Sequence, residues 1–461
     1  FERSFLMKEN VMLVGKPAKT LLLFSLPILA GNLLQQFYSM VDSVVVGNYV
    51  SSNALASVGG MLPLVFMVTC VSFGLANGAS ILIGQYFGAS QKNDMNRLVL
   101  TSLTYSAVIA FVLTVLGLVF SRNLVALLDT PAVVFEDSLL YIRIYFLGLI
   151  FTFCFNMISS VFRSLGDSKT PLVFLALASI LNIILDLVFV IVFEMGVSGV
   201  AIATVISQGV AFLLQMLLLR KKLLEYSGVK KQSLRESFFD KRTFGQLTRL
   251  VIPTTSQELL ISFGMLFTQK FVNGFGPDVM ASYTATSKIV DFAMLPMIGM
   301  SIALTVFAAQ NVGAGMSERV TKGYRAAMIF NMSVAAVLAA VVLVFGKPLI
   351  GAFVGAGASD MLYESGTSFL FYSSFSFVMM ALLFAAEGVM KGAGDVNFFM
   401  VFAIIGSVVK VVASLMLMPT MGYSGIWAGI LIGWSVEAIL TTMRFVTGKW
   451  KTKRLDVGNN N

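Results

Sequence analysis

The segment Val161-Phe-Arg-Ser-Leu-Gly-Asp167 returns later in the chain as Val389-Met-Lys-Gly-Ala-Gly-Asp395. Three further segments recur in the same order, and the members of every pair are separated by 225 to 228 residues. The other pairs are Leu26-Pro27 with Ile252-Pro253, Gln85-Tyr-Phe-Gly-Ala89 with Gln310-Asn-Val-Gly-Ala314, and Met195-Gly-Val-Ser-Gly-Val-Ala201 with Met421-Gly-Tyr-Ser-Gly-Ile-Trp427. Four matches at a nearly constant offset indicate that one half of the chain duplicates the other.

The segments between these motifs are strongly apolar. Of the 461 residues, 57% are hydrophobic and only 12% are charged, and the mean hydropathy is +0.88. Soluble proteins carry a charge on about a quarter of their residues, so most of this chain is expected to lie in lipid. The chain contains no His, and both Cys residues fall in apolar stretches. Because these are the commonest acid–base and metal-binding side chains, the composition disfavours an enzyme.

The apolar runs predict twelve membrane-spanning helices, since about 20 apolar residues cross a bilayer. The predicted spans are 20–47, 53–83, 97–120, 133–160, 170–193, 198–220, 248–273, 281–309, 323–346, 361–388, 396–418 and 424–447. Several runs exceed a straight crossing, so we expect tilted helices or kinks at Pro27, Pro63, Pro253 and Pro296.

Lys and Arg residues are distributed unevenly over the predicted loops. If the N-terminus lies in the cytoplasm, most of the 32 basic residues fall on cytoplasmic segments, and only Arg122 and Lys347 lie on the opposite face. Membrane proteins orient with their positive loops inside. The bias therefore predicts that both termini are cytoplasmic.

Duplication and span number together predict the fold class. We expect an all-α integral membrane protein with twelve transmembrane helices in two six-helix lobes, related by a parallel pseudo-two-fold repeat. The expected parts are an N-lobe over 1–219, a cytoplasmic linker over 220–247, and a C-lobe with a cytoplasmic tail over 248–461. Many secondary transporters are built from such repeats and handle substrate between them. This favours transport, with a duplicated channel or passive scaffold as the alternative.

Six acidic residues lie inside predicted spans, where a charge near the bilayer centre costs at least about 2.5 kcal/mol. They are Asp42, Asp186, Glu258, Asp291, Glu387 and Glu437. Asp42 and Asp186 both fall in the outer half of the N-lobe. Asn182 precedes Asp186 by one helical turn, and Thr204 lies at a similar depth. These oxygen ligands predict a site for Na⁺ or another small cation, or for a proton shared by the carboxylates.

A structural interpretation of the same acids stays open. Asp42 and Asp186 would then only cap or cross-link helices through backbone donors. Arg143 is the one basic residue of the N-lobe spans that could neutralise them.

The second lobe does not repeat this cluster. The corresponding residues are Lys410 for Asn182, Ser414 for Asp186, and a position near Thr268 for Asp42. Lys410 is a base inside a predicted span, so we expect it to pair with Glu258, Asp291 or Glu387. A second hypothesis assigns Glu258, Asp291, Lys410 and Gln35 to a substrate or charge site.

Several motifs resemble those of the multidrug and toxic compound extrusion (MATE) transporters, prokaryotic branch. The matching segments are Leu26-Pro-Ile-Leu-Ala-Gly-Asn-Leu-Leu-Gln35, Val41-Asp-Ser-Val-Val-Val-Gly47, Ala54-Leu-Ala-Ser-Val-Gly59, Arg163-Ser-Leu-Gly-Asp-Ser-Lys-Thr-Pro171 and Gly196-Val-Ser-Gly-Val-Ala-Ile-Ala-Thr204. The resemblance covers essentially the whole chain.

The resemblance implies an antiporter that expels amphipathic, often cationic compounds by alternating access while H⁺ or Na⁺ runs inward. It places the coupling ion at Asp42, Asn182, Asp186 and Thr204, which would also be the Na⁺ ligands of a sodium-coupled transporter. It implies no cofactor besides that ion, no nucleic-acid partner, and a monomer in the cell membrane.

Two points stay open at this stage. Another bacterial branch of the family places functional acids in the seventh and tenth spans. Glu258 lies in the seventh at a spacing from Pro253 that does not align, and Glu387 lies at the end of the tenth. The nearest rival function is a flippase for lipid-linked precursors, for which we expect more intramembrane basic residues than this chain carries.

Overall fold

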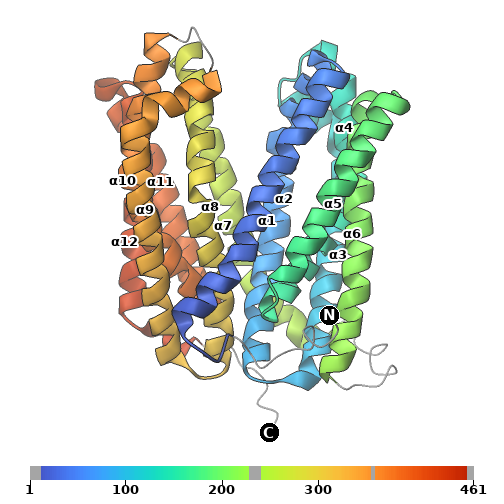
Figure 1. The fold of residues 1–461 in the computed structure, drawn as a ribbon, viewed down its shortest axis with the longest axis vertical. Coiled ribbons are helices and arrows are strands. Elements are labelled where there is room, and N and C mark those ends of the chain that lie inside the picture. The colour runs from blue at the N-terminus through green and yellow to red at the C-terminus, as the bar shows by residue number, and fades with distance from the viewer. Residues whose placement is uncertain (1–11, 228–239, 355–358, 454–461) are drawn as a thin grey trace. The chain divides into compact units, whose positions relative to one another are not determined.

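The computed structural model describes residues 12–227, 240–354 and 359–453. Within these residues no β-strand forms, and twelve helices are long and apolar enough to cross a membrane (Figure 1). The helices are α1 (Pro17–Tyr49), α2 (Ser52–Gly88), α3 (Lys92–Leu127), α4 (Ala132–Ser164), α5 (Lys169–Leu187), α6 (Gly196–Ser227), α7 (Lys241–Asn273), α8 (Pro277–Gly313), α9 (Ser317–Val354), α10 (Asp360–Ala393), α11 (Val396–Met421) and α12 (Ser424–Val446). A π-helical turn, Val188–Val192, continues α5, and a short 3₁₀ turn, Lys449–Thr452, follows α12. The predicted all-α fold with twelve spans is confirmed.

Most of the helices are longer than the predicted spans. A helix of 33 residues, such as α1, extends over roughly 50 Å, whereas the hydrocarbon layer is about 30 Å thick. Hydropathy therefore located the apolar middle of each helix and missed its polar ends. Pro27, Pro63, Pro253 and Pro296 lie inside α1, α2, α7 and α8 as expected.

The chain forms two compact units. Unit 1 holds Ala30–Thr255, and unit 2 holds the described residues up to Leu29 together with the chain from Ser256. The boundaries fall inside α1 and α7, shortly after Pro27 and Pro253, and are related by the same offset as the sequence repeat. The units therefore differ from the predicted lobes, because each one includes the first part of a helix from the other half of the sequence.

Apolar packing explains the assignment of the start of α1 to unit 2. Leu21 and Phe24 are buried in one cluster with Phe307 of α8. Just before α1, Asn311 donates from Nδ2 to the carbonyl of Met12 at 3.0 Å. These contacts attach the first turns of α1 to the core that α8 and α10 build.

The predicted linker 220–247 is helical at both ends. α6 continues to Ser227, and α7 begins at Lys241. Asp240 caps α7 by accepting a hydrogen bond from the backbone N–H of Thr243 at 2.7 Å. Residues 228–239 lie outside the described residues, so the linker's middle is not described.

Helix pairing inside each unit follows one scheme. In unit 1, α4 packs against α2, α3 and α6, and α5 packs against α6. In unit 2, α10 packs against α8, α9 and α12, and α11 packs against α12. Each of these four pairs of unit 1 thus recurs six helices later, which is the arrangement that the sequence duplication predicts.

Candidate functional site

The candidate site lies in unit 1, where α1, α5 and α6 meet. Asp42 projects from the second half of α1, Asn182 and Asp186 from the last turns of α5, and Thr204 from the third turn of α6. A cluster of valines packs these segments together. Its buried members are Val45, Val46, Ala54, Val190, Val197 and Val200.

The amide of Asn182 connects all four side chains. When its nitrogen faces the carboxylates, Nδ2 donates to Asp186 Oδ2 at 3.1 Å and to Asp42 Oδ1 at 3.0 Å. Its oxygen then accepts from the Thr204 hydroxyl at 3.2 Å and from the Thr204 N–H at 3.3 Å. This orientation satisfies both ends of the amide, which decides the assignment of O and N. The four residues expected to gather at one level are brought together.

The two carboxyl groups lie close together. Both accept from the same Asn182 nitrogen, and each lies within electrostatic range of the other. Two ionised carboxylates at this separation repel each other, so the arrangement favours a proton or a cation on the pair. Asp186 is fully buried, and its Oδ1 has no partner among the described residues. A buried carboxylate oxygen without a donor is costly, so the pair offers a place where a proton or a small cation could bind.

Two tyrosines complete the surroundings of the pair. The Tyr38 hydroxyl lies 3.3 Å from Thr204 Oγ1 and also hydrogen-bonds Asp42. Tyr141 of α4 packs on the valine cluster within electrostatic range of both carboxylates. Sequence reasoning missed both residues. Tyr38 lies one turn before Asp42 and could have been found by that spacing, whereas the position of Tyr141 depends on helix packing.

Arg143 does not neutralise the carboxylates. Its Nε donates to Ser121 Oγ at 3.0 Å. Among the described residues, no ion pair includes Asp42 or Asp186. An ion pair between either acid and a basic side chain is therefore excluded among the described residues. A proton or a small cation is left as the partner that could neutralise the two carboxylates.

The donor set fits an alkali cation less directly than a proton. Over the described residues no group of three or more His, Cys, Asp or Glu side chains could hold a metal ion. The cluster offers two carboxylates and a hydroxyl, but the Asn182 amide presents its nitrogen to the carboxylates. Binding of Na⁺ by all four residues would require this amide to rotate.

The predicted second charge site does not form one group. Lys410 Nζ lies 4.7 Å from the centre of the Trp434 ring and faces Glu437, and it makes no ion pair among the described residues. The charged neighbour of Asp291 is Lys288. Gln35 belongs to unit 1, whereas Glu258, Asp291 and Lys410 belong to unit 2. The expected pairing of Lys410 is wrong because its helix face meets α12.

Lys391, on the last turn of α10, has the partner expected for Lys410. Its Nζ lies 2.5 Å from Glu387 Oε1, and both side chains are buried. Gln257 donates to the same carboxylate at 3.4 Å. Glu258 and Glu437 lie within electrostatic range of Lys391. Unit 2 therefore contains a buried charge network centred on a lysine.

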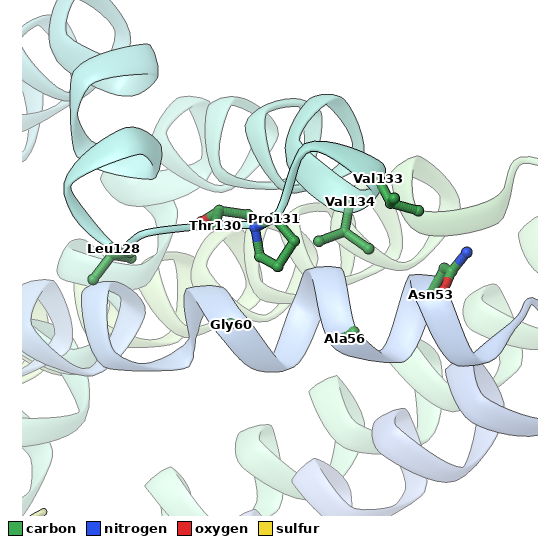
Figure 2. A pocket seen from close by; sticks show the side chains of 8 residues that line it. All are labelled: Asn53, Ala56, Gly60, Leu128, Thr130, Pro131, Val133 and Val134. Carbon is green, nitrogen blue, oxygen red and sulfur yellow. The ribbon is translucent and has the colours of Figure 1, made fainter.

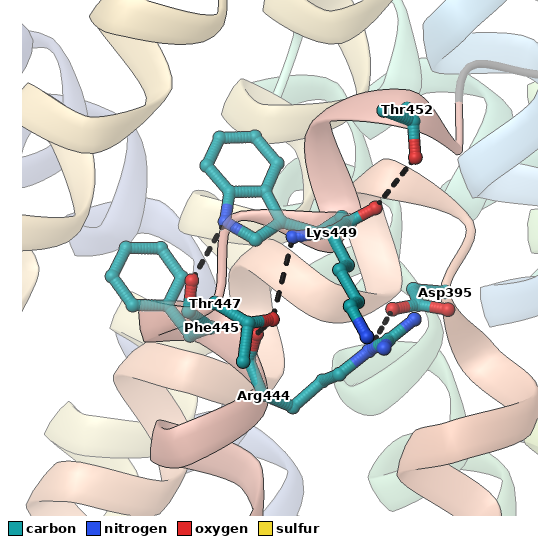
Figure 3. Close-up of polar contacts among 7 residues, drawn as sticks. Asp395, Arg444, Phe445, Thr447, Lys449 and Thr452 are labelled. Carbon is teal, nitrogen blue, oxygen red and sulfur yellow. Dashed lines mark hydrogen bonds and ion pairs between the residues drawn. The ribbon is translucent and has the colours of Figure 1, made fainter.

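The duplicated Gly-Asp motifs form one ion pair in each unit. Asp167, between α4 and α5, accepts from Lys222 Nζ of α6 at 2.6 Å. Burial raises the pKa of Asp167, but hydrogen bonds from Lys222 and Thr170 outweigh it and leave this pKa below its usual value. Asp395, between α10 and α11, accepts from Arg444 of α12 at 2.9 Å, next to the 3₁₀ turn that contains Lys449 (Figure 3). Each pair attaches a helical hairpin to the last helix of its unit.

A cavity of about 390 Å³ lies elsewhere in unit 1, between the start of α2 and the loop that joins α3 to α4 (Figure 2). It is lined by Asn53, Ala56, Gly60, Leu128, Thr130, Pro131, Val133 and Val134. None of the residues of the candidate site lines it. Its lining is largely apolar and carries no ionisable side chain.

The twelve apolar helices and the duplicated helix pairing define a multi-pass membrane protein. The MatE family model matches residues 27–188 and 253–416, one stretch in each half of the duplicated sequence. The chain therefore belongs to the MatE family of multidrug efflux transporters, and it is a transporter and not an enzyme.

Relatives cover almost the full length of the chain. The probable multidrug resistance protein YoeA of Bacillus subtilis is 29% identical over 454 residues, with 96% of each chain covered. The probable multidrug resistance protein NorM of Thermotoga maritima is 23% identical over 98% of this chain and 96% of its own.

Solved structures share the fold. A MOP superfamily transporter from Pyrococcus furiosus superposes with a TM-score of 0.88 at 23% identity, covering 96% of this chain and 99% of its own. An outward-facing multidrug resistance MATE family transporter matches with the same TM-score, identity and coverage.

Proposed function

We propose that this protein is an antiporter that exports amphipathic, often cationic compounds in exchange for an inward flow of protons. The observation that carries this proposal is the buried Asp42–Asp186 pair, whose members accept from one Asn182 amide and form no ion pair among the described residues. The relatives that are named as multidrug resistance proteins support the substrate class. Transport of this kind requires no cofactor besides the coupling ion.

The geometry favours H⁺ over Na⁺ as that ion. A proton on either carboxyl explains why Asp42 and Asp186 can both face one Asn182 amide, since two bare charges would repel. The Asn182 amide donates to both acids and so stabilises the remaining negative charge. Na⁺ stays the alternative, and it would need the amide oxygen turned towards the acids.

Coupling follows from differential affinity for two orientations of the protein. Protonation of one carboxyl halves the negative charge of the Asp42–Asp186 pair, so the arrangement of α1, α5 and α6 that buries the pair becomes more favourable. Deprotonation favours an arrangement that admits water to the acids. A proton gradient then drives the conformational cycle, because a ligand shifts an equilibrium by its differential affinity for the two states.

Dye efflux from reconstituted vesicles tests this function. With pH and Na⁺ gradients imposed separately, we expect a cationic dye to move only under the pH gradient. Asp42→Asn should abolish gradient-driven movement, whereas the exposed Asp137→Asn on α4 should leave it unchanged. Dye movement driven by the Na⁺ gradient alone would show that Na⁺, and not H⁺, is the coupling ion. Full activity of Asp42→Asn would overturn the role of the acid cluster.

The same vesicles separate the rival functions. A flippase would move a lipid-linked precursor and leave the dye in place, and a channel would pass dye without regard to either gradient. We further propose a monomer in the cell membrane with both termini in the cytoplasm. Every residue of the acid cluster comes from one chain, and the basic loops favour this orientation.

A further inference from the structure

One face of α4 carries a stripe of hydrogen-bonding side chains through unit 1. We call this set the α4 stripe. Its members are Tyr145, Thr152, Asn156, Ser159, Ser160 and Ser164. Their spacing of three, four or seven residues places them on a common face of the helix. α4 packs against α2, α3 and α6, so this face lies inside the unit.

The stripe begins next to the acid pair. Tyr141, which lies within electrostatic range of Asp42 and Asp186, precedes Tyr145 by one turn on the same face. The hydroxyl of Tyr145 lies 3.1 Å from Thr69 Oγ1 of α2. Hydroxyl groups therefore extend from the acids into the unit along α4.

The middle of the stripe bonds to both neighbouring helices. Thr152 donates to the side-chain oxygen of Gln208 on α6. One turn later, Asn156 donates from Nδ2 to Ser72 Oγ of α2 at 3.0 Å. Polar side chains from three helices thus meet near the middle of the bilayer.

The stripe continues to the far end of α4. Gln215 of α6 donates to Ser159 Oγ at 3.1 Å. Ser160 and Ser164 donate to carbonyls of α2 at 2.7 and 3.1 Å. The distance along α4 from Tyr141 to Ser164 is roughly 35 Å, which exceeds the thickness of the hydrocarbon layer.

Packing alone does not require these polar groups. In unit 2, α10 makes the same helix pairs as α4. At the positions that correspond to Thr152 and Asn156 it carries the apolar Met380 and Phe384. Ser160 and Ser164 correspond to glycines, whereas Tyr145 and Ser159 correspond to the polar Ser373 and Glu387. The central polar groups therefore occur only in the unit that holds the acid pair.

The stripe has one apolar interruption. Between Tyr145 and Thr152 the same face of α4 presents Gly148 and Leu149. Val205 of α6, the residue after Thr204, packs directly against Gly148. A continuous polar path would let protons leak across the membrane, and this valine closes the path.

We propose that the α4 stripe is the route by which protons travel between the Asp42–Asp186 pair and the far end of unit 1, with Val205 as its closure. This inference rests on the proposed proton coupling. On release, an O–H bond of the protonated carboxyl breaks and leaves a carboxylate. Each hydroxyl, or a water molecule held by the amides of Asn156 and Gln208, then accepts one proton and passes on another.

Dye efflux driven by a pH gradient and dye exchange at equal pH together distinguish a proton route from a purely structural role of the α4 stripe. We expect Thr152→Val and Asn156→Leu to reduce pH-driven dye efflux to less than about a tenth of the wild-type rate. Exchange of dye for dye at equal pH on both sides should persist, because it needs no net movement of protons. Thr114→Val is the matched control, since Thr114 donates to the Phe146 carbonyl of α4 at 2.8 Å away from the stripe. Asn156→Ser replaces the amide with a hydroxyl that can still relay a proton, so this variant should retain efflux.

A gain of function completes the test. Val205→Thr adds a hydroxyl at the interruption, so we expect a faster uncoupled proton leak, measured with a pH-sensitive dye inside vesicles without substrate. If Asp42→Asn abolishes coupling but the stripe variants behave like Thr114→Val, the route is wrong and the coupling site stands. If efflux and exchange fall together, or if Val205→Thr does not leak, the stripe is structural. Full activity of Asp42→Asn would overturn the coupling site itself.

Discussion

At the scale of single residues, Lys391 balances the buried charge of unit 2. It forms an ion pair with Glu387 and lies within electrostatic range of Glu258 and Glu437. Removing this lysine takes away the ion-pair partner of Glu387 and leaves that carboxylate within electrostatic range of Glu437. Removing Glu387 leaves the lysine with two other acids. The two halves of one ion pair are therefore not equivalent.

We predict that Lys391→Met is more destabilising than Glu387→Met. Breaking a buried ion pair by removing one partner costs about 3–5 kcal/mol. Loss of the lysine should lie at the upper end, because Glu387 then faces the like charge of Glu437 and the Gln257 hydrogen bond does not neutralise it. Thermal unfolding of the purified variants in detergent measures the difference. Glu136→Gln is the control, because its exposed pair with Arg122 at 3.4 Å should contribute little. Equal destabilisation by both core variants would contradict the network.

At the scale of helices, glycines set how closely α12 approaches α11. Gly425, Gly429 and Gly433 repeat every fourth residue and line one face of α12. A Cβ atom on Gly429 would lie 2.6 Å from the backbone nitrogen of Ser414, and one on Gly433 would lie 2.6 Å from the Cβ of Lys410. Small residues at such spacing let membrane helices pack backbone to backbone.

We expect Gly429→Ala to destabilise the protein by about 1–3 kcal/mol, because the added methyl group must push two helices apart. Gly60→Ala on α2 is the matched control. No atom lies within 4 Å of the Cβ position of Gly60, and alanine is the better helix former, so stability should hold or rise. The unfolding temperatures of the two variants, compared with that of the wild type, test this prediction. An unchanged unfolding temperature for Gly429→Ala would disprove the close approach of α11 and α12.

At the scale of the whole molecule, each compact unit includes part of a helix from the other half of the sequence. Residues 12–29 belong to unit 2, and the start of α7 up to Thr255 belongs to unit 1. In unit 1, the Thr254 hydroxyl donates to the carbonyl of Gly74 on α2 at 2.8 Å. Neither half of the sequence therefore contains all of the packing partners of one unit.

We predict that the two halves of the chain fold only together. Residues 1–233 expressed alone lack the core into which Leu21 and Phe24 pack, and residues 234–461 alone lack the partners of Val251 and Thr254. Co-expression of both halves should give a monodisperse complex by size-exclusion chromatography, and each half alone should aggregate. A stable, monodisperse 1–233 fragment would show that the exchanged segments are dispensable.

The acid cluster shows how far helical spacing predicts a site. Asn182 and Asp186 share a face because they are four residues apart, and the depth of Asp42 and Thr204 followed from the span bounds. The proximity of the acids, the orientation of the Asn182 amide and the place of Tyr141 did not follow. Each depends on how three separate helices rotate about their axes.

The sequence by itself determined the class of fold, the number of helices, the duplication and the depth of the acids. All of these depend on hydrophobicity, helical period and repeat, which are properties of contiguous residues. Only the tertiary structure decided which base pairs with which acid, where the compact units divide, and that the hydroxyls of α4 form a stripe between α2 and α6. Those outcomes depend on which helix faces meet, and contacts between residues far apart in the chain leave no periodic signal in the sequence.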